Sequence, residues 1–308
     1  MTSLRGERLG SGAVTETFVA TSFGAEGFEK TVVEKRVHPA LAAIPRFVDA
    51  FVAEAQRASA LSHANVVLLM DVARDASGYR LVTEYVDGVD LARLLELSRA
   101  AGVVLPAPLV AFIGAEVAKG LDYAHRRRGG AVVHGGLSLT NVLVSRDGAV
   151  KISDFGVHRA REDAGFAPDE LRARPFRSPE RLAGGEATKA ADVFALGAIL
   201  RELTKGGPAF EPAEALAGPE DARPTAGAFH ETILAWAYAR GGLGASANEL
   251  AKLVARLQRD TPSRRSRAVS RARWTRPWSP RRAARSPRKS PARRVHDRRG
   301  RARSRCSW

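Results

Sequence analysis

The chain has 308 residues, enough for one large domain or two small ones, and its apolar content of 44% is ordinary for a globular protein. No run of about 18 apolar residues occurs and no signal peptide is visible, so the sequence predicts no membrane span. The single cysteine, Cys306, excludes an intramolecular disulfide, which fits the cytoplasmic location that we expect.

The formal net charge of +16 belongs to one end of the chain. Residues 261–308 hold 18 Lys and Arg against one acid, Asp297, for a net charge of +17. Residues 1–260 therefore hold 31 basic and 32 acidic groups, for a net charge of −1. This nearly neutral part gives no indication of nucleic-acid binding by itself.

The N-terminal part of the chain is rich in predicted strands. Residues 4–20 predict a hairpin with Gly10 and Gly12 at its turn, a pattern that alone is typical of an ordinary turn. Residues 31–37, Thr-Val-Val-Glu-Lys-Arg-Val, are β-branched and predict a strand that carries Lys35.

One long helix and a further strand follow. From Phe47 to Leu61, apolar residues recur at spacings of three and four, which predicts a helix that contains Glu54. Residues 79–86, Tyr-Arg-Leu-Val-Thr-Glu-Tyr-Val, predict a strand that leads into Asp87-Gly88-Val89-Asp90-Leu91.

The sequence predicts mainly helices between about residue 109 and residue 260. The apolar stripe from Leu109 to His125 predicts a long amphipathic helix, and helices are also expected at 229–239 and 246–259. Between them, 142–144 and 150–152 predict two short strands around a turn.

Nine features that occur in order resemble those of bacterial Ser/Thr protein kinases of the Hanks type. His134 and Asn141 are seven residues apart, and Asn141 and Asp154 thirteen, as in the catalytic loop and the Asp-Phe-Gly turn of that family. The nine features are Gly10/Gly12, Lys35, Glu54, the 87–91 hinge, His134, Asn141, Asp154-Phe155-Gly156, Ser178-Pro179-Glu180 and Asp192.

The resemblance covers about residues 4–260 and implies a two-lobed α+β kinase fold. We therefore expect one kinase domain over 1–260, with a small β-rich N-lobe at 1–86. The hinge and a mainly helical C-lobe would take 87–260. Residues 261–308 form a separate Arg/Ser/Pro-rich tail.

The resemblance also implies that ATP and Mg²⁺ bind between the lobes. Glycines in the hairpin let backbone N–H groups approach phosphates, although the third family glycine is Thr15 here. Lys35 is expected to meet the α- and β-phosphates while paired with Glu54. By family position, Thr83 gates the rear of the adenine pocket. The expected ATP-binding residues are Gly10, Gly12, Lys35, Glu54, Glu84 and Val86 (backbone groups on adenine), Asp90 (ribose) and Leu143 (under adenine), and the expected metal ligands are Asn141 and Asp154.

Several departures lie in the catalytic part. Where the family has Arg and the catalytic Asp, this chain has Gly135 and Gly136, so no side chain there accepts the proton of a substrate hydroxyl. Ser138 stands where most members have Lys, although some bacterial kinases have Ser. Ala173 falls where a Thr usually bonds to the catalytic Asp. His134 is a packing residue in kinases, and we do not expect it to act as a base.

The usual phosphorylation switch is also absent from the sequence. The segment from Val157 to Arg177 contains no Ser, Thr or Tyr, and Gly135 removes the Arg that pairs with an activating phosphate. We further expect Asp192 to brace the backbone of the catalytic loop. Arg223 and Arg240 are both candidates for the late Arg that pairs with Glu180.

These features support two main hypotheses. In the first, the chain is a pseudokinase that binds ATP and Mg²⁺ and has a signalling or scaffolding role, since loss of a general base costs about 10²–10⁴ in rate. In the second, it is a slow but active protein Ser/Thr kinase, since phosphoryl transfer depends mainly on positioning and metal electrostatics. The variant Gly136→Asp should gain activity if that position alone is at fault. The sequence identifies neither a protein substrate nor a partner.

The tail at 261–308 gives a third, weaker hypothesis. Arg, Ser, Pro and Ala with few aliphatic residues cannot bury enough apolar surface to fold alone, so we predict a disordered basic segment. Such a segment contacts nucleic acid or acidic lipid weakly and with strong salt dependence. An equally weighted interpretation is a translated out-of-frame stretch, because GC-rich DNA yields this same residue mixture.

Overall fold

The computed structural model describes residues 2–75, 78–165, 174–205, 213–216, 218–240 and 246–260. By its internal contacts the chain divides into residues 1–262 and 263–308, and the description below concerns the first of these. The predicted disordered tail at 261–308 and the departure at Ala173 lie outside the described residues.

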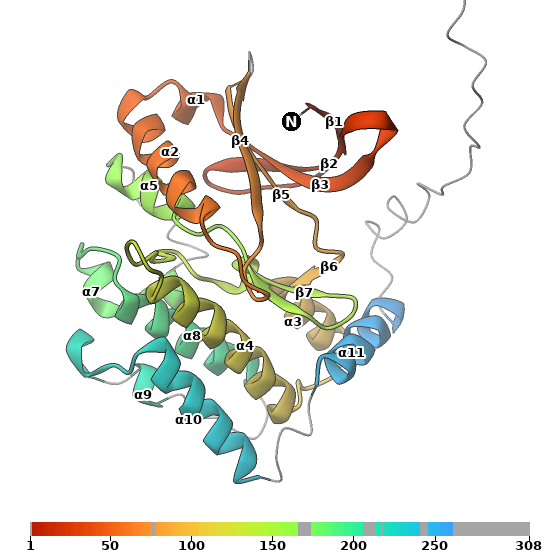
Figure 1. Cartoon of the computed structure of the whole chain (residues 1–308). Helices are drawn as coiled ribbons and strands as arrows, with labels where there is room; N and C mark the ends of the chain where they lie inside the picture. Colours follow the sequence, from red (N-terminus) through yellow and green to blue (C-terminus); the bar gives the residue numbers. More distant parts are fainter. Residues whose placement is uncertain are drawn as a thin grey trace, which may run out of the picture. The chain divides into compact units, whose positions relative to one another are not determined.

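An antiparallel sheet in the order β1-β2-β3-β5-β4 forms the N-terminal lobe (Figure 1). The β-branched run of the central strand explains its place, because such side chains fit a pleated and half-buried surface. The strands are β1 (Thr2–Ser11), β2 (Thr15–Phe23), β3 (Glu29–Val37), β4 (Leu69–Asp75) and β5 (Gly78–Glu84).

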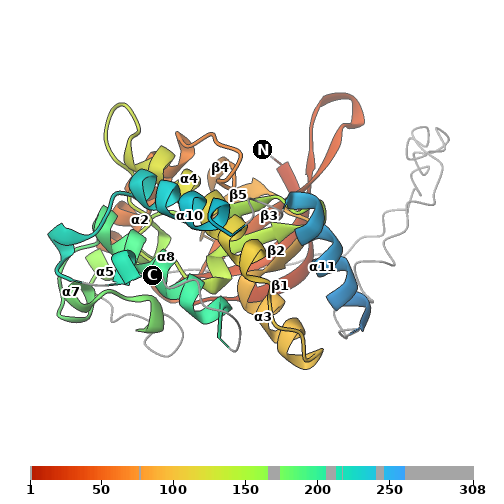
Figure 2. The ribbon, with the colours of Figure 1, turned by 90° about the horizontal axis from the view of Figure 1, so that it is seen from below.

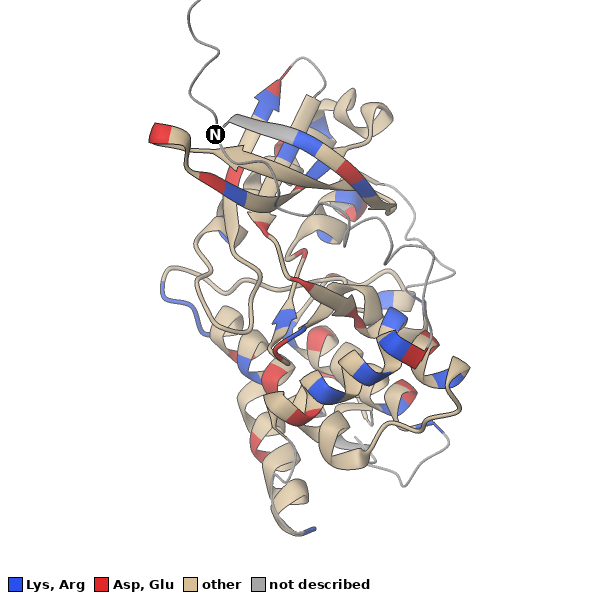
Figure 3. Ribbon diagram, turned by 90° about the vertical axis from the view of Figure 1, so that its right-hand side faces the viewer, with Lys and Arg blue, Asp and Glu red and all other residues tan. Residues whose placement is uncertain are grey.

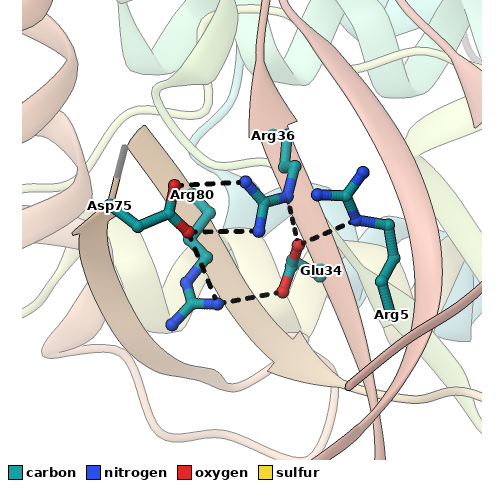
Figure 4. A network of polar contacts seen from close by, with 5 residues as sticks. All are labelled: Arg5, Glu34, Arg36, Asp75 and Arg80. Atoms are coloured by element: carbon teal, nitrogen blue, oxygen red, sulfur yellow. Dashed lines mark hydrogen bonds and ion pairs between the residues drawn. The ribbon is translucent and has the colours of Figure 1, made fainter. Parts of the chain in front are cut away.

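A polar network ties four of these strands together (Figure 4). Glu34, only 1% exposed, accepts a hydrogen bond from Arg36, forms an ion pair with Arg80 at 3.2 Å, and lies 3.7 Å from Arg5. Arg36 and Arg80 also contact Asp75, at 3.2 and 3.9 Å. A buried charge is tolerated only when it is paired in this way, so the network holds β1, β3, β4 and β5 in register.

Two helices complete this lobe, α1 (Pro39–Ala42) and α2 (Pro45–Ser59). The second is the helix expected at 47–61, and it starts two residues earlier because Pro45 occupies its first turn, where a fixed φ suits a helix start. Phe47 and Phe51 lie on its buried face, with ring centroids 5.7 Å apart.

The C-terminal lobe is mainly helical, with a small sheet in the order β6-β7-β8 facing the first lobe (Figure 1). The small sheet contains both strands expected around residue 147. Its strands are β6 (Gly88–Asp90), β7 (Val142–Ser145) and β8 (Val150–Ile152). The helices are α3 (Leu91–Ala100), α4 (Ala107–His125), α5 (Val157–Asp163), α7 (Pro179–Leu182), α8 (Lys189–Leu203), α9 (Ala213–Leu216), α10 (Ala226–Tyr238) and α11 (Ala247–Asp260).

The main core lies around α4, which runs alongside α10 and α8, while α11 packs on α3 (Figure 2). A Cβ at Gly114 would lie 2.8 Å from the side chain of Leu200, so glycine allows α4 and α8 to approach closely. The predicted two-lobed α+β architecture is confirmed, and so are the helices expected at 109–125, 229–239 and 246–259. The sequence did not predict α3 or α5.

Acidic and basic residues are interspersed along the ribbon of both lobes (Figure 3). This mixture agrees with the net charge of −1 over residues 1–260. Within the described ranges, none of the helices combines the length and the apolar character needed to span a bilayer.

Candidate functional site

Lys35 and Asp154 form an ion pair at the junction of the two lobes. The Nζ of Lys35, on β3, lies 2.5 and 2.6 Å from the two carboxylate oxygens of Asp154. Burial raises the pKa of Asp154, but the Lys35 ammonium outweighs this effect and holds that pKa below its usual value. Asp154 has a φ of 67°, in the left-handed region that Asp tolerates better than most residues. The carboxylate is therefore charged and aimed at the lysine.

The expected Lys35–Glu54 pair is not formed, which corrects the sequence prediction. Glu54 is buried on α2, but its carboxylate accepts hydrogen bonds from Arg57 and lies 3.4 Å from Arg159 of α5. The reason is the position of α5 beside α2. A Cβ at Gly156 would lie 2.5 Å from Oε2 of Glu54, so the glutamate faces the start of α5 instead of the lysine.

The glycine-rich hairpin has the expected form. Gly10 pairs with Thr17 across the strands, and the N–H of Gly12 donates to Thr15 at 2.9 Å to close the turn. The tip residue Val14 is only 1% exposed and packs in one apolar cluster with Phe51 of α2 and with α5. The tip of the hairpin is thus anchored toward the helices.

The segment that leads into the hinge carries three of the predicted adenine-pocket residues, Thr83, Glu84 and Val86. Thr83 is buried near the end of β5. The carboxylate of Glu84 accepts a hydrogen bond from Nζ of Lys151 at 2.8 Å. Among the described residues, the backbone groups of Val86 take no hydrogen-bond partner. They are available for the adenine contact expected of them.

Asp90 and Leu143 pair across β6 and β7, so the structure brings the two together. Asp90 caps α3: its carboxylate accepts from the N–H of Arg93 at 2.7 Å, as N-cap residues do. Burial raises the pKa of Asp90. The cap accounts for one carboxylate oxygen, and the contact to ribose stays a prediction.

His134 is a packing residue, as expected. Its ring lies 4.8 Å from that of Phe155, its Nδ1 accepts from the N–H of Gly136 at 3.2 Å, and its Nε2 donates to the carbonyl of Ser153 at 2.8 Å. Burial lowers the pKa of His134. Both ring nitrogens of a neutral imidazole are therefore in use, and His134 is not free to take a proton.

Asp192, at the start of α8, fixes the backbone of this loop. Its carboxylate accepts from the N–H groups of His134 and Gly135, at 2.7 and 2.9 Å, and from Nε2 of His125 at 2.9 Å. This is the bracing role expected for Asp192. These hydrogen bonds use the backbone of the loop and need no side chain at residue 135.

His158, on α5, lies against the position of the missing base. A Cβ at Gly136 would lie 2.6 Å from Cβ of His158, and 2.8 and 2.9 Å from its Cγ and Cδ2. Real Cβ atoms essentially never approach other atoms closer than 3.0 Å. Burial lowers the pKa of His158, which keeps its ring neutral. The space next to Gly136 is therefore filled.

Asn141 and Asp154 supply the oxygen donors that Mg²⁺ prefers, and such ions commonly take one or two protein ligands plus phosphates and water. In this structure both are engaged. Oδ1 of Asn141 accepts from the hydroxyls of Ser138 and Thr140, at 2.7 and 3.0 Å, and Asp154 holds Lys35. The donor set fits a magnesium ion, and the carboxylate of Asp154 is shared with Lys35.

Glu180 pairs with Arg223, which resolves the choice between two candidates. The guanidinium donates to both carboxylate oxygens, at 2.6 and 2.8 Å. Arg240 instead lies over the ring of Trp236, at 4.6 Å from its centroid. The hydrogen bonds from Arg223 lower the pKa of Glu180 to about 2.

A small, mostly apolar pocket lies beside Lys35 and is lined by residues of α2. Thr83, Glu54 and Asp154 are among its lining residues. It brings together residues from the predicted adenine gate, the helix and the metal turn. The cleft thus brings these residues together, although Lys35 and Glu54 are not paired and residue 136 has no side chain.

Comparisons with known proteins agree with this geometry. A family model described as "Protein kinase domain" matches residues 4–273. The chain belongs to the protein kinase family. The match extends 13 residues beyond the boundary that we placed at 260.

Two curated relatives are bacterial kinases. The tyrosine-protein kinase MasK of Myxococcus xanthus is 33% identical over 205 residues, which cover 63% of this chain and 31% of MasK. The serine/threonine-protein kinase PknB of Mycobacterium tuberculosis is 31% identical over 213 residues, which cover 67% of this chain and 32% of PknB. The matched part spans about a third of the length of these relatives.

The fold is also similar to solved structures. The crystal structure of the Mycobacterium tuberculosis PknI kinase domain matches with a TM-score of 0.60 at 24% identity, covering 77% of this chain and 96% of that one. This likeness shows the two-lobed protein kinase fold. Of the predicted site residues, Lys35, Glu54, Thr83 and Asp154 line the apolar pocket. His158 was not predicted, because no motif marks it and its contact with Gly136 depends on how α5 folds.

Proposed function

We propose that this chain is a nucleotide-binding pseudokinase that acts through signalling or scaffolding rather than through rapid phosphate transfer. One observation carries the proposal: Gly136 has no side chain to accept a proton, and His158 fills the adjacent space, while Lys35, Asp154 and Asn141 remain at the cleft. The kinase family generally uses ATP and Mg²⁺.

In this proposal each retained group has a role toward the nucleotide. Lys35 binds the α- and β-phosphates after it leaves Asp154, and the backbone of Val86 binds the adenine edge. Asp154 and Asn141 hold Mg²⁺, which supplies positive charge against the phosphates. The hairpin glycines let the backbone approach the phosphates.

A second candidate is a slow but active protein kinase. The retention of Lys35, Asp154 and Asn141 favours it, since phosphoryl transfer depends mostly on positioning and on charge. The curated relatives carry the names of Ser/Thr and of tyrosine kinases, so both kinds of hydroxyl are candidates for the acceptor. The missing base lowers the expected rate by about 10²–10⁴.

One paired experiment tests the proposal: the thermal shift with Mg·ATP and the transfer of labelled phosphate to a generic protein substrate. We expect a shift with nucleotide, its loss in Lys35→Met, and transfer at least about 100-fold below that of ordinary kinases. Lys252→Met is a matched control, because Lys252 is exposed on α11 and pairs only locally with Glu249.

Two outcomes would contradict the proposal. Turnover within about 100-fold of ordinary kinases that Asp154→Ala abolishes would identify the slow kinase instead. No shift with nucleotide, with or without Mg²⁺, would exclude both candidates.

A further inference from the structure

The short helix α5 contacts four separate parts of the domain. Its buried residues Val157 and Ala160 belong to the same apolar cluster as Val14 of the hairpin tip and Phe51 of α2. Arg159 lies 3.4 Å from Glu54. The helix is therefore part of the N-lobe core and more than a surface turn.

The other end of α5 is held from the C-lobe side. The carboxylate of Glu162 accepts hydrogen bonds from both Arg177 and Arg181. Both guanidiniums are largely buried, with side chains 14% and 10% exposed. Charge-assisted pairs at buried positions are the stronger kind, so Glu162 fixes the end of the helix.

The underside of α5 rests on Gly135 and Gly136. A Cβ at Gly135 would lie 3.4 Å from Cβ of Arg159 and 3.2 Å from Cβ of Ala187, and its φ of 72° lies in the left-handed region. A Cβ at Gly136 would collide with His158 at 2.6 Å. No residue other than glycine fits at 136 while α5 keeps this place.

We propose that α5 is a latch that packs on Gly135 and Gly136. In this latch, His158 occupies the volume that the side chain of the missing base would take, and it closes the side of the cleft where the substrate hydroxyl would enter. The two glycines are then more than a loss of catalytic residues: they are the small partners of a packed contact. This inference does not depend on nucleotide binding by the chain.

The atoms involved make a selective test possible. The nearest atom to the Cβ that Gly136→Ala adds is Cβ of His158, whose position is set by the backbone and cannot rotate away. His158→Ala keeps that atom, whereas His158→Gly removes it. A clash at this contact is therefore relieved by glycine at 158 and persists with alanine.

The experiment measures urea unfolding and amide hydrogen exchange of residues 157–163 for Gly136→Ala, His158→Ala, His158→Gly and the two double variants, without nucleotide. We expect Gly136→Ala to raise the equilibrium constant for unfolding by about tenfold or more. Amide exchange in α5 should also become faster. His158→Gly should remove most of that penalty, and His158→Ala should leave it. Gly10→Ala is the control for stability, since nothing lies within 4 Å of its added Cβ.

Glu162→Gln tests the latch from its other end if Gly136→Ala does not fold. It weakens the contacts to Arg177 and Arg181 without touching the glycines, and we expect faster exchange in α5. The inference is overturned if Gly136→Ala leaves stability and exchange unchanged. It is also overturned if Gly136→Ala lowers stability by the same amount in the His158→Gly variant as in the native chain. Unchanged exchange in Glu162→Gln would overturn it equally.

Discussion

The Nζ of Lys35 contacts both carboxylate oxygens of Asp154, at 2.5 and 2.6 Å, while Glu54 of α2 faces Arg159 instead. The two opposite charges thus neutralise each other across the cleft. If the proposed nucleotide binding takes place, Lys35 would contact phosphate and Asp154 would contact the metal ion.

The Lys35–Asp154 pair should stabilise the domain in the absence of nucleotide. In a double-mutant cycle of Lys35→Met and Asp154→Asn, we expect a coupling energy of about 1–2 kcal/mol, because both groups are largely withdrawn from water. Chemical unfolding of the four proteins measures it. The exposed pair Lys252–Glu249 on α11 is the control and should couple by less than ~0.5 kcal/mol. Equal coupling in the two cycles would contradict a special role for the cleft pair.

Restoring the base alone should not restore activity. Gly136→Asp places a Cβ 2.6 Å from that of His158, so we expect lower stability and no gain in phosphate transfer. Together with His158→Gly, the same change should raise transfer measurably, toward the ~10²-fold expected of a general base. A full gain from Gly136→Asp by itself would show that this position alone is at fault, as the sequence suggested.

The buried Glu34 should be costly to neutralise. Glu34→Gln leaves Arg36 and Arg80 without their shared carboxylate, and we expect the free energy of unfolding to fall by about 3 kcal/mol. Glu16→Gln is a matched control on the same sheet. Glu16 pairs with Arg8 at 2.7 Å, but both side chains are exposed, and the expected loss is below ~1 kcal/mol. Similar losses in both variants would contradict this account of the network in Figure 4.

Glu180 should make the domain sensitive to acid. Its pKa is about 2 in the fold, against an ordinary value of 4.5, because Arg223 hydrogen-bonds its charged form. The resulting stabilisation, roughly 2–3 kcal/mol, is complete above pH 4.5 and is lost as the pH falls from there toward 2. Unfolding measured between pH 3 and pH 6 should therefore show a flatter profile for Glu180→Gln than for the native chain. Parallel profiles would rule out this contribution.

The basic segment at 261–308 should account for any binding to nucleic acid. With 18 Lys and Arg, it predicts weak binding to DNA at low salt that falls steeply as salt rises. Filter binding of the full chain and of a chain ending at residue 260 measures this. Absence of binding at low salt would remove the hypothesis, and equal binding by both chains would move it to the folded part.

Much of the cleft could be predicted because kinase residues recur at fixed separations. Lys35 lies on a strand and Asp192 at the start of a helix, as expected, whereas β5 ends at Glu84, two residues before the predicted end of that strand. Patterns along the chain therefore identify which residues approach the site.

The partners of these residues could not be predicted in the same way. Lys35 could pair with either Glu54 or Asp154. It pairs with Asp154 because α5 engages Glu54, and the seven residues of α5 are too few to show a recognisable helical pattern in the sequence. Glu180 had two candidate arginines, and Arg223 is selected by burial over Phe194, at 5.0 Å from the ring. The contact between His158 and Gly136 joins residues on separate elements, which only tertiary packing brings together.

Asp192 carries a wider consequence. Its carboxylate holds the catalytic loop through the backbone N–H groups of residues 134 and 135, which every residue type except proline provides. These two hydrogen bonds therefore do not depend on the side chains of residues 134 and 135. The anchor that Asp192 provides therefore survives a change of side chain in the loop, which separates what shapes a catalytic loop from what performs chemistry in it.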